Sequence, residues 1–537
     1  MRMWKSKQIK ARQLQIFVII ALAITSTRLV KEAISAAPKT VVIGAEGAIP
    51  ALDPQRTNGT IGLRVIDAIF DPLVREDLSK ATLNAPELQP SLASSWTVSA
   101  DGLTYTFVLR QNVLFHDGTP FNAASVQSNF ERILDKSSPF FDERASGNMT
   151  FLTRWIKHTK VIDAHTFVIV LKEPFTGLPR LLSDRRMSIV SPDALNKFKG
   201  DQLGYTPVGT GPFMLKKFAQ GQQLILLRNE KYWGGVPGVA RLIFKPITDP
   251  TALAIAMQTG QIDIIPSASS QQVAQLKMDQ NIQVLYPEPA NLYFIRLNTR
   301  SGITKDMHFR QALNYAINRA GIAAVMDGQA SPIFGPVPLG NEISGASSTP
   351  RYGYNPAMAK QLLAQAGIKT PVTLKLLSPN SGPGFGLATQ IMSLIQQDLK
   401  AVGINLQTQY LDFTTLVSLE SPGYNDDVNG SFNGWTTGAE SGYWFERMFS
   451  GPQRPPRGVN RGWYQNVDVD KLFEQARGEV NADKKNKLYR QATEQVAADA
   501  PWVFLYQDRL PRLVRKRILG VQPARSVYID YAKLTVR

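Results

Sequence analysis

The segment from residue 372 to residue 410 constrains the fold more than any other part of this chain. It predicts a strand, a helix from about 387 to 402, and a second strand over 404–410, where polar and apolar residues alternate. The helix carries one apolar stripe that stops at Gly403, and its members are Leu387, Ile391, Leu394, Ile395, Leu399 and Val402. A helix of this length is the usual right-handed crossover between parallel strands. The sequence therefore predicts an α/β lobe with a partly parallel sheet, and such sheets collect ligands at their edges.

Two hairpins are expected earlier in the chain. The first covers 96–110, because apolar and polar residues alternate after a turn that ends at Gly102. The second covers 162–171, with its turn near 163–165. One face of the first hairpin is expected to be buried.

Three more helices are marked by the residues at their ends. Asn122 caps a helix expected over 123–134. A helix over 356–366 has an asparagine before it, a proline at its first position and a glycine just past its end. A late helix ends before Pro501, and the residues that place it against the core are Leu488, Ala492 and Val496. Strands and helices interleave with no internal repeat and no long Ser/Gly linker, so lobes of this protein would be joined by crossing strands.

Composition excludes several classes of function. The 537 residues include no cysteine, so structural disulfides, thiol catalysis, thiolate zinc sites and a lipid on an N-terminal cysteine are impossible. After residue 25, no stretch has the roughly 18 apolar residues that a membrane span needs. A membrane channel or a transporter core is therefore excluded.

Residues 1–37 have the pattern of a signal peptide. Positions 1–13 are basic and contain no acid, and an apolar run over 14–24 follows that is too short to span a bilayer. Small residues at 35–37 offer a cleavage site, although the stretch 25–34 is longer and more charged than usual. The cut position stays open, as does an uncleaved amphipathic anchor. Export would place the body in the periplasm, with no lipid anchor because there is no cysteine.

The net charge of +17 raises the question of a nucleic-acid partner. Part of the excess lies in the expected signal peptide and does not belong to the folded body. The body has no blocks of Lys or Arg, no recognition helix and no aromatic–basic motif. The charge is interpreted as dispersed solvated surface, and no nucleic acid is expected.

Motifs for metal binding and catalysis are missing. None of the histidines has the i, i+4 spacing with an intervening glutamate of a helical zinc site, and they are His116, His158, His165 and His308. No metal and no cofactor is therefore expected. The chain has no G-x-S-x-G nucleophile elbow and no G-x-x-x-x-G-K-[ST] phosphate loop. A two-carboxylate glycosidase is not excluded by any motif, and it is unsupported.

Two local patterns are expected to be turns rather than sites. His116 and Asp117 are adjacent and precede a glycine, which is a turn signal and not the geometry of a catalytic dyad. The glycine-rich run over 382–386 lacks the lysine of a phosphate loop and is expected to be a turn before the helix from Leu387.

Many short fragments, taken in order, resemble one family. They are LASSW (92–96), DGLTYTF (101–107), VLFHDGTPFN (113–122), VGTGPF (208–213), YWGG (232–235), GQID (260–263), RQALNYAI (310–317), PAMAKQLLAQAG (356–367) and IQQDLKAVGI (395–404). Together they resemble the extracellular solute-binding proteins of family 5, the dipeptide, oligopeptide and nickel class that serves ABC importers. Most fragments are turns and helix faces, so this signature predicts architecture better than specificity.

The resemblance implies an α/β protein of the periplasmic-binding-protein fold, class II type, with two lobes and a hinge of two crossing segments. Residues 38–286 would form the first lobe with an extra subdomain inserted over about 61–195, residues 287–505 the second lobe, and residues 506–537 the return to the first. The crossings are expected near 287–289 and 503–505. A ligand would be enclosed between the lobes, and the closed form would dock on the permease.

The resemblance also points to a ligand site, and there the sequence departs from the family pattern. Peptide-binding relatives hold the ligand's amino group with an aspartate just after a Gly-Trp, but the loop that begins with Trp435 and Thr436 has none. Glu440 is the nearest acid and is the candidate partner of a cationic group, a plain surface position being the open alternative. Dipeptide binders place an arginine where Pro379 stands, followed here by Asn380. A strict dipeptide binder is therefore not expected.

The remaining candidate ligand-binding residues follow strand ends and the first crossing. Tyr293 and Trp435 are expected to be walls of the cleft, since aromatic faces cover peptide planes, sugar faces or apolar side chains without demanding one identity. For Tyr293 a place in the core stays equally open. Glu46 and Gly47 follow a strand over 41–45, and Glu46 is a second candidate partner for a cation.

The expected function is that of a periplasmic substrate-binding protein. It would capture a peptide or peptide-like small solute as a monomer and deliver it to the ABC permease subunits of the inner membrane, without catalysis. The alternatives are a secreted hydrolase of peptides or glycosides, and a receptor for a metal chelate or haem.

Overall fold

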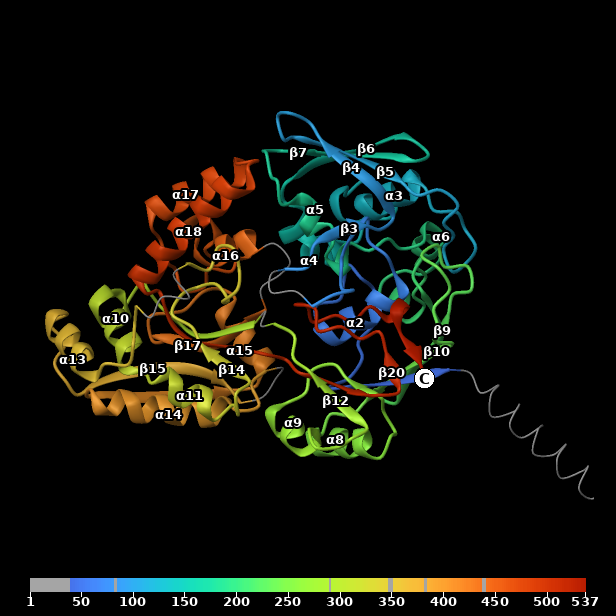
Figure 1. The fold of residues 1–537 in the computed structure, drawn as a ribbon. Coiled ribbons are helices and arrows are strands. Elements are labelled where there is room, and N and C mark those ends of the chain that lie inside the picture. The colour runs from blue at the N-terminus through green and yellow to red at the C-terminus, as the bar shows by residue number, and fades with distance from the viewer. Residues whose placement is uncertain (1–38, 82–84, 289–290, 346–350, 381–383, 437–440) are drawn as a thin grey trace, which may run out of the picture.

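The computed structural model of the protein describes residues 39–81, 85–288, 291–345, 351–380, 384–436 and 441–537. The expected signal peptide and Glu440 lie outside the described residues. The fold is mixed α/β, as the sequence predicts. Its two largest sheets each anchor a body: the first body is built on a seven-stranded sheet and the second body on a six-stranded sheet (Figure 1). Among the described helices, none is both long and apolar enough to cross a membrane.

Strands from both ends of the chain form the seven-stranded sheet. Its order is β12 (Ile282–Leu285), β19 (Arg512–Arg515), β11 (Ile264–Ile265), β1 (Thr40–Ala45), β10 (Arg241–Pro246), β9 (Gln223–Arg228) and β8 (Phe213–Ala219). Strand β1 is parallel to β10 and β11. Its side chains alternate between two layers: Val41 and Ile43 pack in the core that includes α2 (Thr60–Ile69), and Val42 faces α8 (Pro250–Gln258) and α9 (Ser270–Leu276).

The six-stranded sheet contains the predicted crossover. Its order is β14 (Ala330–Pro332), β18 (Trp502–Asp508), β13 (Asn291–Leu297), β17 (Gly430–Thr436), β15 (Val372–Pro379) and β16 (Ile404–Leu411). Strands β15 and β16 are parallel, and the helix between them is α14 (Ala388–Ala401). This confirms the strand–helix–strand prediction.

Helices cover both faces of the six-stranded sheet. Leu292 and Phe294 of β13 pack with α16 (Ser441–Phe449), α17 (Val467–Gly478) and α18 (Ala482–Asp499). Tyr293 and Ile295, which point the other way, pack with α10 (Met307–Ala316), α11 (Arg319–Ala324), α13 (Pro356–Gln365) and α14. Helix α15 (Phe413–Glu420) follows β16. The second body is therefore a three-layer sandwich, in which the two faces of the sheet pack in two different hydrophobic cores.

The chain passes between the two sheets at two points. It leaves the first sheet after β12 and enters the second at β13, and it returns between β18 and β19. Residues 503–505 lie inside β18, so the return begins after Asp508. The residue boundaries of the lobes given above stay a prediction.

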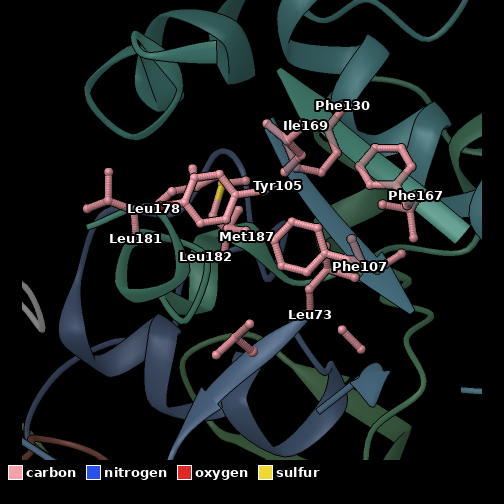
Figure 2. Close-up of a cluster of buried hydrophobic side chains, with 14 of the residues drawn as sticks. Leu73, Tyr105, Phe107, Phe130, Phe167, Ile169, Leu178, Leu181, Leu182 and Met187 are labelled. Carbon is pink, nitrogen blue, oxygen red and sulfur yellow. The ribbon is translucent and has the colours of Figure 1, made fainter. Parts of the chain in front are cut away.

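A four-stranded antiparallel sheet, in the order β4-β5-β7-β6, forms a subdomain of the first body. Its strands are β4 (Ala93–Val98), β5 (Thr104–Leu109), β6 (Ile156–Asp163) and β7 (Thr166–Leu171), and their pairing confirms both predicted hairpins. Phe107, Phe130 and Phe167 meet in its core, where Phe130 comes from α3 (Ala123–Leu134) (Figure 2). Helix α4 (Glu143–Thr153) packs against α3.

Short elements complete the fold. In the first body they are α5 (Leu178–Leu181), α6 (Pro192–Lys197), α7 (Gln202–Tyr205), the strand pair β2 (Val74–Glu76) and β3 (Leu88–Pro90), and the pair β20 (Ile518–Leu519) and β21 (Thr535–Val536).

The predicted helix ends are confirmed by their hydrogen bonds and backbone angles. The Asn122 side chain accepts from the backbone of Ser125, whose side chain completes a capping box. Asn355 caps α13, and Gly403 after α14 has a φ of 84°. The late helix α18 stops at Ala500, before the proline.

The turn that contains Gly209 holds the first body together by close backbone approach. A Cβ on Gly209 would lie 2.3 Å from the carbonyl oxygen of Ile69 and 2.9 Å from Cα of Phe70. Backbone atoms cannot move aside as a flexible side chain can. The signature fragment over 208–213 therefore specifies this contact and not a ligand.

We expect Gly209→Ala to lower the free energy of unfolding by about 2 kcal/mol, because the added methyl group overpacks the backbone. The matched control is Gly147→Ala in α4, where no heavy atom lies within 4 Å of the new Cβ. That change should stabilise the protein by about 0.5–1 kcal/mol through helix propensity. Urea denaturation of both variants measures this; equal effects of the same sign would contradict it.

Candidate ligand-binding site

The two bodies meet at helix α16, which Figure 1 shows facing α4 and α5 of the first body. Tyr443 of α16 is fully buried within the core of the four-stranded subdomain. Its ring lies edge-on to Trp155 and Phe175, with centroids 5.9 Å and 5.8 Å away, and its hydroxyl donates to the backbone oxygen of Phe151. We call this contact between α16 and the subdomain the seam.

An aromatic hollow lies beside the seam, on the α16 face of the six-stranded sheet. Its free space is about 10 Å³, room for about one water molecule, and it is lined by Leu292, Pro336, Val337, Trp435, Trp444, Phe445, Met448 and Trp502. The rings of Trp435 and Trp444 are 5.7 Å apart at 56°. The indole nitrogen of Trp435 is buried and has no hydrogen-bond partner in the described part of the chain. The hollow therefore offers apolar, mostly aromatic walls.

Tyr293 lies at the base of the second-body hinge rather than in this hollow. Because it follows Leu292 along β13, its side chain points to the opposite face of the sheet from Trp435, which pairs with Leu292. Tyr293 is 4% exposed and stacks on Tyr506 with centroids 4.6 Å apart. It also hydrogen-bonds to Asp508. The two expected aromatic walls are thus placed on different faces.

Asp508 carries the titratable group of the hinge. The Asn291 side-chain amide donates to its carboxylate at 3.0 Å. Burial raises the pKa of Asp508 to about 6, against the opposing effect of hydrogen bonds from Asn291 and Tyr293. Both ends of the crossing therefore converge on one buried carboxyl group.

The other expected site residues lie apart from one another. Glu46 forms an ion pair with Arg64 at 3.1 Å within the first body, and Gly47 packs near Ile61 of α2. Asn380 is exposed at the end of β15, where its backbone nitrogen donates to the backbone oxygen of Leu411.

Thr436 is the last residue of β17 and is paired through its backbone with Asn291. Glu440 lies outside the described residues. Of the seven expected site residues, the structure thus brings Trp435 and Thr436 together as chain neighbours beside the hollow.

Arg447 and Phe151 of the seam were missed by the sequence reasoning, whereas Tyr443 and Trp444 are aromatic residues for which a place in the core is the default expectation. Trp444 and Arg447 are three apart on α16, so a helical pattern over 441–449 places them on one face. Phe151 comes from a helix almost three hundred residues earlier, and no local pattern connects it with α16.

Glu446 is a buried acid of the seam. Arg477 pairs with one of its oxygens at 3.3 Å, and the other is buried without a hydrogen-bond partner in the described chain. Burial raises the pKa of Glu446 to about 7, opposed by Arg477 and Arg154 and assisted by Glu173. Because Glu446 lies between the two bodies, its protonation depends on whether the bodies are in contact.

The described residues contain no group of three His, Cys, Asp or Glu that could hold a metal ion. His116 bonds through Nε2 to the oxygen of Gly211 at 2.9 Å, and burial lowers the pKa of His116 to about 4. Asp117 accepts from Thr119 and Ser191. The pair forms a structural turn, as the sequence predicts.

Comparison with known proteins identifies the family. The family described as "Bacterial extracellular solute-binding proteins, family 5 Middle" matches residues 87–456. The chain belongs to this family. The glutathione-binding protein GsiB of Escherichia coli O1:K1 is 30% identical to this family 5 protein over 507 residues, which cover 94% of the chain and 95% of the relative.

Solved structures agree with this family 5 fold. The ABC transporter-associated periplasmic binding protein DppA of Helicobacter pylori, in complex with the peptide STSA, has a TM-score of 0.80 at 25% identity and covers 93% of this chain and 98% of its own. A dipeptide-binding protein from Pseudoalteromonas sp. SM9913, in complex with Met-Leu, has a TM-score of 0.81 at 20% identity, with 93% and 100% covered. As a member of this family, the protein is an extracellular solute-binding protein.

We expect Asp508→Asn to remove a pH dependence of stability. The native carboxyl has the higher pKa, so the folded state binds its proton more tightly than the unfolded state. The free energy of unfolding therefore falls as pH rises from about 4 to about 6, by on the order of 3 kcal/mol. Asparagine still accepts from Asn291 and stays neutral.

The measurement is urea denaturation of wild type and Asp508→Asn at pH 4, 5, 6 and 7. The difference between them should grow with pH in favour of the variant. A constant difference across this range would contradict the raised pKa.

Proposed function

We propose that this protein captures a peptide or peptide-like solute between its two bodies and delivers it to the permease subunits of an inner-membrane ABC importer. The observation that carries the proposal is the tryptophan-lined hollow beside the seam, within the second body and next to its contact with the first. Removal of the expected signal peptide would release the protein into the periplasm, where it would act as a monomer without nucleic acid or cofactor.

The lining of the hollow suits a peptide better than a strongly polar solute. Indole faces cover peptide planes and apolar side chains, and a free indole N–H can donate to a peptide carbonyl. The names of the relatives agree with this class, since one is a glutathione-binding protein and another holds the peptide STSA. The proposed class is therefore short peptides and their conjugates.

Closure would couple capture to delivery. A solute that touches both bodies favours the arrangement in which α16 meets the subdomain, because it makes contacts there that the open form lacks. The permease would then recognise the closed arrangement.

We expect at least one short peptide to stabilise the mature protein in a thermal-shift screen. The protein is first refolded to remove carried-over solute, and the panel contains glutathione, Ser-Thr-Ser-Ala, Met-Leu and tri- to pentapeptides, with opines, amino sugars, oligosaccharides and metal chelates as competitors. Binding to the folded state alone stabilises it by about 2.7 kcal/mol at a hundred times Kd. Recovery of unchanged peptide supports capture; stabilisation by the competitors alone would contradict the peptide class.

We expect Trp435→Ala to weaken binding of the most stabilising peptide by about 1–3 kcal/mol, the scale of a buried aromatic contact. Isothermal titration calorimetry measures the affinity, and the melting temperature of the unliganded protein is recorded in parallel. The control is Tyr354→Ala, at a tyrosine 48% exposed. Unchanged affinity together with a large loss of unliganded stability would place Trp435 in the core instead.

A further inference from the structure

Arg447 is a buried cation that lacks a carboxylate partner. The residue is 8% exposed and lies on α16 at the seam. Its guanidinium carbon is 4.6 Å from the ring centroid of Phe151 and 4.7 Å from that of Trp444. Among the described residues, no hydrogen bond or ion pair reaches the guanidinium, and the groups that contact it are aromatic faces.

The other arginines near Arg447 are better compensated. Three of them form ion pairs: Arg186 with Asp184 at 2.6 Å, Arg477 with Glu446 at 3.3 Å, and Arg461 with Glu420 at 3.3 Å. The fourth, Arg154, is attracted to Glu446. Among these arginines, Arg447 is therefore the one that is neither paired with nor attracted to an acid of the seam.

The charged form of Arg447 is destabilised by its surroundings. Burial, together with repulsion from Arg186, Arg154 and Arg461, lowers the pKa of Arg447 to about 10. The aromatic rings attract the cation, but more weakly than a carboxylate does. Phe151 belongs to the first body, so part of the burial arises only when the bodies meet. Closure without a solute thus reduces the hydration of an unpaired cation.

We propose that Arg447 binds a carboxylate of the captured solute and thereby makes closure favour anionic solutes. The proposal rests on the proposed function and names the chemistry of one end of the solute. Trp444 connects Arg447 with the hollow. Its ring contacts the guanidinium and also lines the hollow beside Trp435. A solute against Trp435 can therefore extend a carboxylate to Arg447, whose planar fork donates two parallel hydrogen bonds to it.

The competing role for Arg447 is structural, as a cation held between rings to join the bodies. The two roles differ in the unliganded protein. A structural cation stabilises the closed arrangement, so its loss opens the protein. A carboxylate receptor opposes closure until the solute arrives, so its loss closes the protein.

Small-angle X-ray scattering of unliganded, refolded protein separates these roles without any solute. We expect Arg447→Met, which keeps the length and apolar stem, to have a smaller radius of gyration than wild type. The control Arg144→Met changes an arginine side chain of α4 that is 66% exposed and should leave the radius unchanged. An equal or larger radius for Arg447→Met would overturn the proposal.

Calorimetry then tests the carboxylate. The probes are Ser-Thr-Ser-Ala and Met-Leu, each as free acid and as C-terminal amide. We expect wild type to bind the better acid at least tenfold more tightly than its amide, and Arg447→Met to lose at least tenfold for the acid but less than threefold for the amide. Equal losses for acid and amide would overturn the proposal.

Failure of the proposed function gives a different pattern. If no peptide binds wild type, the peptide class is wrong, and the carboxylate is tested with citrate, succinate and an opine against neutral oligosaccharides. Binding of the carboxylates, lost in Arg447→Met, supports the role of Arg447 independently of peptides. Binding of neutral solutes alone overturns the role of Arg447. The scattering experiment needs no solute, so its result holds whichever solutes bind.

Discussion

The pairing of outgoing and returning strands at the hinge is the constraint on which the rest of this structure depends. In the first sheet β12 is antiparallel to β19, and in the second sheet β13 is antiparallel to β18. At both crossings the chain therefore leaves one hydrogen-bonded pair of strands and enters another. At the second-body end, Asn291 lies opposite Asp508 in the ladder and donates to its side chain. Rotation of one body against the other about this pair is the motion that the topology allows.

Closure about this hinge brings together groups with opposite preferences. Tyr443 and the rings of the subdomain gain free energy by leaving water. Their neighbours on the same helix, Glu446 and Arg447, lose hydration, and only Glu446 keeps an ion-pair partner among the described residues. The seam is therefore complementary in shape but not in charge. An apolar solute adds to apolar burial that already favours closure. A solute with a carboxylate instead pairs with Arg447 and removes the desolvation cost that opposes closure. We therefore expect the charge of a solute to discriminate more strongly than its apolar surface.

The sequence predicted those parts of the fold that local chemistry specifies. Asn122, Asn355 and Gly403 mark helix ends because caps and positive φ angles demand these residue types, and the structure confirms all three. The faces of β13 could not be predicted, because every residue of this strand is buried and no alternation of polar and apolar residues reveals its two sides. For that reason the sequence left Tyr293 open between the cleft and the core, and the structure places Tyr293 and Trp435 on opposite faces of the sheet. The contact of Phe151 with α16 depends on tertiary structure alone.

The difference between local and tertiary constraints also explains why the sequence predicts the family of this protein better than it predicts the solute. Gly209 sits where a side chain would strike the backbone of Ile69, so the fold itself excludes other residues there. The seam holds Arg447 through ring contacts with Phe151 and Trp444 and not through close backbone approach. Burial of its guanidinium costs hydration, and the ring contacts offset that cost only in part. The aromatic faces attract the cation more weakly than a carboxylate would, so a carboxylate from outside the chain would complete its pairing.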